Sequence, residues 1–360
     1  MKAGALAACC LAVAALLLLA PSQSLAGARS GLELCAEVVI PSLFPFMCLS
    51  GFIIRSGLAH KAGRLFEPAM RLIFRLPGCT AIALGLGLIG GYPVGAAAAA
   101  ELCSSGSITK RQAERLLCFC INSGPAFIIG AVGAGILRST QAGILLYAAH
   151  IGASLIIGLL AGFFSKRSPS DKSGRAIVKR SPLPEAFVGS VTQAAQSMIA
   201  ICAFVVLFAS LISLLSFTGT LGGLASMLAQ AIPAESAAFY RSLLIGFLEV
   251  TNGCAGAAAK GVNALLLLPV ILSFSGLSVH CQVMAAVRRA GLSIRAFVAT
   301  RVLHIIFALA LTWLLFSLFP VALPTFATNT IPLTASVHSA PACVALLFMS
   351  AMLLLSQLRV

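Results

Sequence analysis

Long apolar stretches separated by short polar segments dominate the chain. The stretches are residues 5–20, 37–54, 77–101, 116–136, 141–164, 187–216, 240–261, 263–285, 297–319 and 341–358. Most of them approach the ~20 residues that a helix needs to cross the hydrocarbon core of a bilayer. This pattern predicts an all-α polytopic membrane protein.

Composition excludes an ordinary soluble enzyme. Of the 360 residues, 60% are hydrophobic and only 9% are charged, whereas a soluble domain has about 25% charged residues. The formal net charge of +15 would suggest nucleic acid binding in a soluble protein. Here the Lys and Arg residues lie in short loops between apolar runs, a distribution that orients membrane proteins. We therefore expect a lipid bilayer, and no nucleic acid, as a partner.

The basic residues also predict which loops share a side of the membrane. Lys and Arg concentrate in residues 55–75, 102–115, 166–180 and 286–296, and are absent from 218–239 and 320–340. The positive-inside rule places the four basic loops in the cytoplasm. Because two of these loops flank 77–101, that segment has to enter and leave on the same face.

We therefore predict that residues 77–101 form a re-entrant helical hairpin. Its tip would be 90–95 (GGYPVG), because glycine and proline break helices. Two half-helices of ~10 residues would reach ~15 Å, half of the ~30 Å hydrocarbon core. The same argument predicts a second hairpin over 240–261, entering from the outside with its tip at 249–253. Ordinary spanning helices that the Gly and Pro residues merely kink are the alternative.

A weak internal repeat accompanies this topology. Gly253 follows Gly95 by 158 residues, and Ser275-Gly276 follow Ser123-Gly124 by 152 residues. Each repeat would consist of a span, a hairpin, a broken span and a span. The whole would be about eight transmembrane helices plus two re-entrant hairpins, in two repeats inserted in opposite senses. Inverted repeats with discontinuous helices are typical of secondary transporters.

Five segments follow from this interpretation. They are an N-terminal transmembrane helix or signal-like segment (1–28), a first repeat (29–165), a basic cytoplasmic linker (166–186), a second repeat (187–320), and a loop with a C-terminal transmembrane helix (321–360). Whether the first segment is cleaved stays open, with an uncleaved helix favoured. In either case residues 22–36 would face outward.

Polar residues at the hairpin tips and inside two spans are the candidates for solute binding. Breaks at 122–125 and 273–276 would leave backbone groups unpaired, which is tolerated around a wet cavity, and half-helix N-termini there suit an anion. A proline-kinked helix whose serine bonds its own carbonyls is the alternative. The candidates for binding or gating are Gly91, Tyr92, Pro93, Gly95, Asn122, Ser123, Gly124, Pro125, Glu249, Thr251, Asn252, Gly253, Ser275 and Gly276. We expect no metal and no cofactor.

Glu249 stands out because it is an acidic residue deep inside an apolar run. Burying it costs about 2.5–3.5 kcal/mol on insertion scales. It could gate, couple transport to a proton or cation, or hold the hairpin tip. A structural pairing with Lys260 or with a polar group of the other hairpin is the alternative. Tyr92, Thr251 and Asn252 would be its hydrogen-bonding neighbours.

One enzymatic hypothesis was considered and set aside. Ser123 and His150 could form the dyad of an intramembrane serine protease. We expect His150 near the cytoplasmic end of its helix and Ser123 near mid-membrane, too far apart, and no oxyanion-binding group is evident. No enzymatic activity is expected.

Several short motifs occur in an order that resembles a known family. They are 39–46 (VIPSLFPF), 67–71 (EPAMR), 91–95 (GYPVG), 113–116 (AERL), 122–125 (NSGP) and 249–253 (EVTNG). Over roughly residues 30–320 the chain resembles the sporulation integral membrane protein YlbJ (SpoVV) family of endospore-forming bacteria. That family belongs to the nucleoside-recognition (Gate) domain group, which is distantly similar to concentrative nucleoside transporters.

The resemblance implies a function in spore formation. The expected role is to move dipicolinic acid, a small dicarboxylate anion, across the mother-cell-derived outer forespore membrane. A nucleoside or other small-solute permease of the Gate group is one alternative, and a non-transporting scaffold for spore morphogenesis is another. The sequence leaves the oligomeric state open, a homo-oligomer included.

Overall fold

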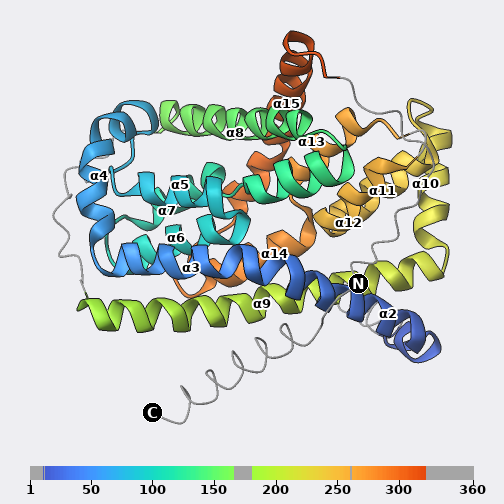
Figure 1. Cartoon of the computed structure of the whole chain (residues 1–360), viewed down its shortest axis with the longest axis horizontal. Helices are drawn as coiled ribbons and strands as arrows, with labels where there is room; N and C mark the ends of the chain where they lie inside the picture. The colour runs from blue at the N-terminus through green and yellow to red at the C-terminus, as the bar shows by residue number, and fades with distance from the viewer. Residues whose placement is uncertain (1–10, 12, 166–180, 260–261, 322–360) are drawn as a thin grey trace, which may run out of the picture.

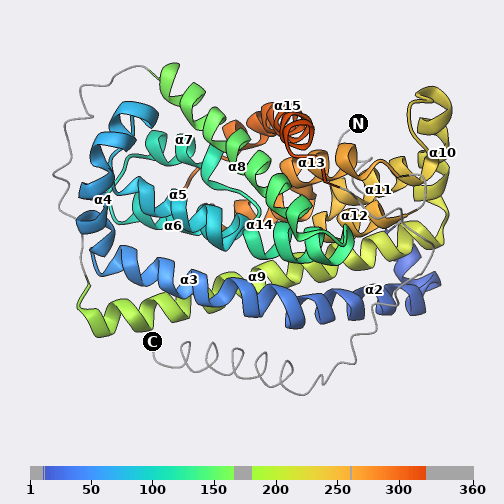
Figure 2. The same cartoon turned by 45° about the horizontal axis from the view of Figure 1, so that its top comes forward.

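The structure is a computed structural model that describes residues 11, 13–165, 181–259 and 262–321, and within these residues every regular element is a helix (Figures 1 and 2). The first half comprises α2 (Pro21–Leu34), η1 (Cys35–Val39), α3 (Ile40–Arg55), α4 (Leu58–Ala69), η2 (Met70–Phe74), α5 (Thr80–Gly90), α6 (Tyr92–Ser104), α7 (Lys110–Cys120), η3 (Ala126–Ile136) and α8 (Thr140–Phe163). The second half comprises α9 (Leu183–Phe217), α10 (Thr220–Ala231), α11 (Ala237–Leu248), α12 (Val250–Ala255), η5 (Gly256–Ala258), α13 (Ala264–Phe274), α14 (Gly276–Arg288) and α15 (Arg295–Leu318). The predicted all-α fold is confirmed.

The order of elements in the first half recurs in the second. Each half has a long helix, a short helix, two short helices joined as a hairpin, a helix in two pieces, and a final single helix. The short helix α4, with η2, turns by 85° from α3. Figure 1 shows α4 at one end of the molecule and α10 at the opposite end, with hairpin α5–α6 on the α4 side and hairpin α11–α12 on the α10 side.

Four helical segments are long and apolar enough to cross a membrane: α8, α9, α13 with α14, and α15. The bent pair formed by α3 and α4 would make a fifth. Within the predicted first span (5–20), residues 11 and 13–20 are described and are helical up to residue 19, whereas the last predicted span (341–358) lies entirely outside the described residues. The described part of the chain therefore supports a polytopic membrane protein with four or five candidate spans.

Large apolar side chains cover the outer helices. Leu207 on α9, Val302 on α15 and Trp313 on α15 expose between 60% and 75% of their surface. An apolar outer surface of this extent suits contact with lipid rather than water. By contrast the hairpins and broken helices contribute most of the buried core.

Residues 22–36 do not form the outward-facing segment that the sequence suggested. They are helical, and α2, η1 and α3 run on from one another along α9. Gly27 allows the close approach, since a Cβ there would lie 2.7 Å from the carbonyl oxygen of Ala209. Ser213 donates a hydrogen bond to the carbonyl of Gln23 (2.8 Å). The small residues of this segment form a helix-packing stripe.

The basic segments 55–75, 102–115 and 286–296 and the residues on either side of 166–180 meet at one end of the molecule. Contacts between them are Arg55 Nε to Glu101 Oε1 (3.2 Å), Ser181 N to Arg55 O (3.1 Å), Arg75 Nη1 to Ser165 O (3.0 Å) and Ser293 N to Glu114 Oε1 (2.8 Å). The first arm of hairpin α5–α6 begins beside α4, where Gly78 N donates to Glu67 Oε2 (2.6 Å). Both ends of this hairpin therefore lie at the basic end, as the positive-inside argument required.

The second hairpin is less regular than predicted. Its first arm, α11, is followed by a six-residue α12 and the 3-10 turn η5, in place of two arms of equal length. Gly256, where α12 ends, packs so closely on Ser242 of α11 that a Cβ would collide with the Ser242 hydroxyl. The chain therefore turns back close to α11, and the second arm is short. The segment 218–239, expected as a loop, contains the helix α10.

Candidate functional site

The tip of hairpin α5–α6 is a single residue, Gly91. Its φ of 91° lies in the region open to glycine. Gly87 and Gly95 face each other across the two arms, and a Cβ on either would collide with the carbonyl oxygen of Cys120. A Cβ on Gly124 would lie 2.8 Å from the carbonyl oxygen of Ile89. The hairpin tip is therefore packed directly against the end of α7 and the residues that follow it.

Those residues, 121–124, form a non-helical segment that we name break 1. Its polar groups bond side chains of α8 and the last turn of α7: Ser123 N–H donates to His150 Nε2 (3.1 Å) and Asn122 Nδ2 donates to Phe119 O (2.8 Å). Ser154 Oγ also donates to Phe119 O (2.5 Å). Pro125 then precedes η3. Break 1 is thus a polar junction built with a neighbouring helix, and not a proline kink closed by its own serine.

Arg301 on α15 completes this junction. Only 1% of its surface is exposed, and its guanidinium donates from Nη2 to Cys118 O (2.7 Å) and from Nη1 to Ile121 O (3.3 Å). These carbonyls lie at the C-terminus of α7, where a cation complements the helix dipole. Among the described residues no carboxylate lies within 4.0 Å of the guanidinium.

Two histidines extend the contact from Arg301 to α8. Arg301 Nη1 donates to His304 Nδ1 (3.0 Å), so the ring hydrogen of His304 is on Nε2, which donates to His150 O (3.1 Å). His150 Nε2 is the acceptor for Ser123 N–H. Both imidazoles use a ring nitrogen as acceptor and are therefore neutral, and their rings pack with centroids 4.6 Å apart and planes tilted by 34°. The cluster as a whole carries the single positive charge of Arg301.

The contact between Ser123 and His150 corrects one expectation. The sequence predicts that these residues lie too far apart to meet, but they are in contact. However, the donor is the backbone N–H of Ser123, and its hydroxyl makes no hydrogen bond to the imidazole. The pair does not have the arrangement of a serine nucleophile with its base.

Tyr92 connects hairpin α5–α6 to the other half of the molecule. Its hydroxyl donates to Leu272 O (2.8 Å), near the end of α13, and it neighbours the side chains of Ser123 and Ser275. Of the three hydrogen-bonding neighbours predicted for Glu249, Tyr92 is wrong, because its hydroxyl donates to the last turn of α13, whereas Thr251 and Asn252 do bond Glu249.

Glu249 joins α11 to α12 and is 3% exposed. Its carboxylate accepts from Thr251 N (3.0 Å), Asn252 N (2.8 Å) and Asn252 Nδ2 (2.9 Å). It is the N-cap of α12, which satisfies backbone donors and places a negative charge at the positive end of the dipole. Of the roles considered, holding the hairpin tip is the one that this geometry displays. Lys260 lies outside the described residues.

The interruption between α13 and α14, which we name break 2, is formed by Ser275 and Gly276, whose φ angles are 75° and 67°. Ser275 Oγ bonds back to Leu272 O (3.4 Å), and His280 Nδ1 bonds Gly276 O (2.7 Å). A Cβ on Gly276 would lie 3.0 Å from Gly246 O on α11. Each hairpin tip is thus seated on the break of its own half.

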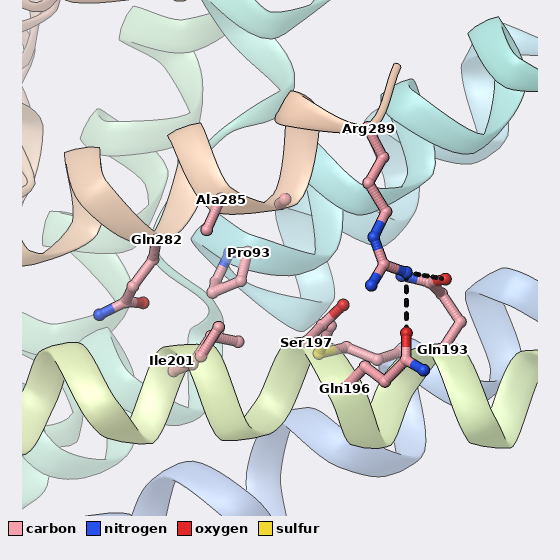
Figure 3. A pocket seen from close by; sticks show the side chains of 11 residues that line it. Pro93, Gln193, Gln196, Ser197, Ile201, Gln282, Ala285 and Arg289 are labelled. Carbon is pink, nitrogen blue, oxygen red and sulfur yellow. Dashed lines mark hydrogen bonds between the residues drawn. The ribbon is translucent and has the colours of Figure 1, made fainter. Parts of the chain in front are cut away.

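A cavity of about 110 Å³, lined by both polar and apolar side chains, opens beside hairpin α5–α6 (Figure 3). Arg289 lies at one side and donates from Nη1 to Gln193 Oε1 (3.2 Å) and to Gln196 Oε1 (2.7 Å). The lining residues are Met47, Pro93, Gln193, Gln196, Ser197, Ala200, Ile201, Gln282, Ala285, Ala286 and Arg289. Of the candidates from the sequence, Pro93 is the one that lines this cavity.

The sequence reasoning missed Arg301, His304, Gln282 and Arg289 as members of a site. Arg301 was counted within the apolar run 297–319. An arginine inside a membrane-spanning segment is costly to bury and usually functional, so its position in this apolar run could have identified it as a site residue. The sequence does not single out the glutamines of the cavity, because a neutral amide on a long helix gives no indication of its hydrogen-bond partner.

Comparisons with known proteins show the family of the chain. The family model described as Nucleoside recognition (Gate) matches residues 36–143, which run from η1 through hairpin α5–α6 and break 1 into α8. The sporulation integral membrane protein YlbJ of Bacillus subtilis (strain 168) is 30% identical over 321 residues, covering 82% of this chain and 78% of the relative. No solved structure matches the chain. The chain belongs to the family of the sporulation integral membrane protein YlbJ.

Proposed function

We propose that the protein is a secondary transporter that moves dipicolinate, a small dicarboxylate, across the outer forespore membrane during sporulation. Membership of a family of sporulation membrane proteins supports the setting. Hairpins seated on broken helices support transport, because discontinuous helices meeting inside the membrane are the usual solute sites of secondary transporters.

The observation that carries the anionic character of the solute is Arg301. A cation that is 1% exposed and has no carboxylate partner among the described residues is costly to bury. It lies at break 1, which the tip of hairpin α5–α6 covers. An anion arriving at this junction would supply the missing opposite charge, and its attraction to the cluster would offset its own loss of hydration.

We further propose that the two halves are inverted repeats and that both hairpins are re-entrant. Hairpin α5–α6 would enter from the cytoplasm, since its two ends lie among the basic segments. Hairpin α11–α12 would enter from the opposite face, where the flanking residues 218–239 contain no Lys or Arg. With the first apolar run, of which residues 11 and 13–20 are described, and the last, which is outside the described residues, this gives about eight transmembrane helices.

A nucleoside or other small-solute permease is the second candidate, because the matching family model is described as Nucleoside recognition. The structure offers Tyr92, Asn122 and Ser123 as groups that suit an uncharged polar solute as well. Competition experiments in proteoliposomes with dipicolinate and with nucleosides separate the two candidates. A scaffold without transport activity would move neither.

The proposal is tested by complementing a Bacillus subtilis strain that lacks YlbJ with this chain and its variants. Asn122→Ala and Glu249→Gln should assemble at normal abundance but yield spores whose dipicolinate content is several-fold lower, with dipicolinate retained in the mother cell. Glu33→Gln is the matched control for the second variant, because Glu33 is exposed and pairs only with Arg29 on its own helix. Normal spore dipicolinate in both test variants at normal abundance would contradict the proposed site.

A further inference from the structure

The cavity beside hairpin α5–α6 lies between the hairpin tip and the basic end of the molecule. Pro93, at the start of α6, and Arg289, directly after α14, both line it (Figure 3). The segment that follows Arg289 contacts the N-terminal part of α7 through Ser293 N and Glu114 Oε1 (2.8 Å). A solute leaving the hairpin tip toward the basic end would therefore pass this cavity.

Hydrogen-bond donors dominate the polar lining. Gln193 and Gln196 each use the side-chain oxygen to accept from Arg289, so their amide NH₂ groups remain available as donors. The Ser197 hydroxyl can donate as well. No Asp or Glu is among the lining residues. This set suits an acceptor with negative charge, because a guanidinium and amide donors together recognise a carboxylate.

The start of α6 also favours a negatively charged ligand. No side chain caps this helix, whereas the corresponding second arm of the other hairpin, α12, is capped by the Glu249 carboxylate. An uncapped N-terminus presents the positive end of a helix dipole. Its first turn, at Pro93, lines the cavity that also holds Arg289. The start of α6 and the Arg289 guanidinium therefore border the same cavity, with the Val94 and Gly95 N–H groups bonded to Gly91 O.

We propose that this cavity is a carboxylate-binding station on the cytoplasmic route, in which Arg289, Gln193 and Gln196 hold one carboxylate of the solute between the hairpin tip and the cytoplasm. The identity of the solute rests on the proposed function, but the preference for a carboxylate rests on the lining. Arg289 acts here as a binding residue, and the two glutamines orient its guanidinium.

The test uses the full-length protein in nanodiscs for calorimetric binding and in proteoliposomes for transport, with dipicolinate and with pyridine-2-carboxylate as probes. Arg289→Gln should weaken dipicolinate binding about tenfold or more, the loss expected for a charge-assisted hydrogen bond of about 1.5–3 kcal/mol. Arg288→Gln is the matched control, because it removes the same charge from an exposed neighbour that does not line the cavity. It should change binding less than twofold, within the range of surface charges.

Gln196→Glu distinguishes ligand binding from a structural role. A glutamate there would strengthen the contact with Arg289 and preserve the packing, yet it would place a negative charge in the cavity. Binding should fall as much as with Arg289→Gln, and dipicolinate should suffer more than the singly charged probe. A purely structural role for Arg289 would leave Gln196→Glu at or above the wild-type affinity, and that result would overturn the proposal.

The outcomes separate this inference from the proposed function. If the wild type transports dipicolinate and Arg289→Gln matches Arg288→Gln, the station is refuted while transport stands. If the wild type binds dipicolinate through Arg289 but moves none across the bilayer, the station stands and the transport proposal fails. If the wild type binds neither probe, the carboxylate station is refuted.

Discussion

Break 1 and break 2 occupy equivalent places in the two halves, but different groups hold them. At break 1 the end of α7 is capped by Arg301 from α15, and the segment is bonded to His150 from α8. At break 2 Ser275 bonds back to its own turn, and one hydroxyl, from Tyr92, reaches in from the other half. The same backbone path is thus stabilised by an ion at one site and by neutral groups at the other.

The two hairpin tips also differ, in the side chain that each contributes. Gly91 and Glu249 are 158 residues apart and both separate the two arms of a hairpin. The first contributes no side chain, and the second contributes a buried carboxylate that caps its own arm. The two halves therefore share an order of elements while their charges differ: a cation lies at break 1 and an anion at the tip of the other hairpin.

Of the substitutions that test this comparison, Arg301→Met should have the largest effect on stability. It removes two charge-assisted hydrogen bonds to the end of α7, about 1.5–3 kcal/mol each, and leaves buried carbonyls unpaired. Hydrogen exchange of peptides covering residues 118–124 should accelerate strongly, and the thermal midpoint should fall. Tyr92→Phe is the counterpart at break 2 and should cost only about 0.5–1.5 kcal/mol, with faster exchange at 272–276 alone. Unchanged exchange at break 1 in Arg301→Met would refute the capping role.

Gly95→Ala should have the next largest effect. Its Cβ would collide with the carbonyl oxygen of Cys120, so hairpin α5–α6 has to move away from break 1, at a cost of about 1–3 kcal/mol. Solute binding should be lost together with stability. Gly85→Ala on α5 is the control, since nothing lies within 4 Å of its Cβ and alanine favours the helix by about 0.5–1 kcal/mol. Equal stability of the two variants, measured by thermal unfolding, would contradict the close packing.

Ser123→Ala should have the smallest effect. The bond to His150 uses the backbone N–H, which alanine retains, so break 1 should keep its exchange rate and its stability. His150→Ala should by contrast accelerate exchange at residues 121–124, because the Ser123 N–H loses its acceptor. If Ser123→Ala abolished activity while leaving binding and stability intact, the serine hydroxyl would have a chemical role that this geometry does not provide.

The sequence predicted backbone interruptions better than it predicted their partners. Gly91, Ser123-Gly124 and Ser275-Gly276 mark the hairpin tip and both breaks, because glycine and proline act on the chain locally. Arg301 was missed because its partners are carbonyls more than 175 residues away, and a backbone carbonyl leaves no trace in a sequence. Residues 22–36 were misjudged because small residues suit both a loop and a helix-packing stripe.

The most direct test of the central claim, that hairpin α5–α6 enters and leaves the membrane on one face, is the sidedness of Lys61 and Lys110. Both side chains are exposed, one on α4 before the hairpin and one at the start of α7 after it. A membrane-impermeant amine reagent should modify both lysines in inside-out vesicles and neither in right-side-out vesicles, as read by peptide mass spectrometry. Modification of the two lysines from opposite sides would show that residues 77–101 cross the bilayer, and would contradict the re-entrant hairpin.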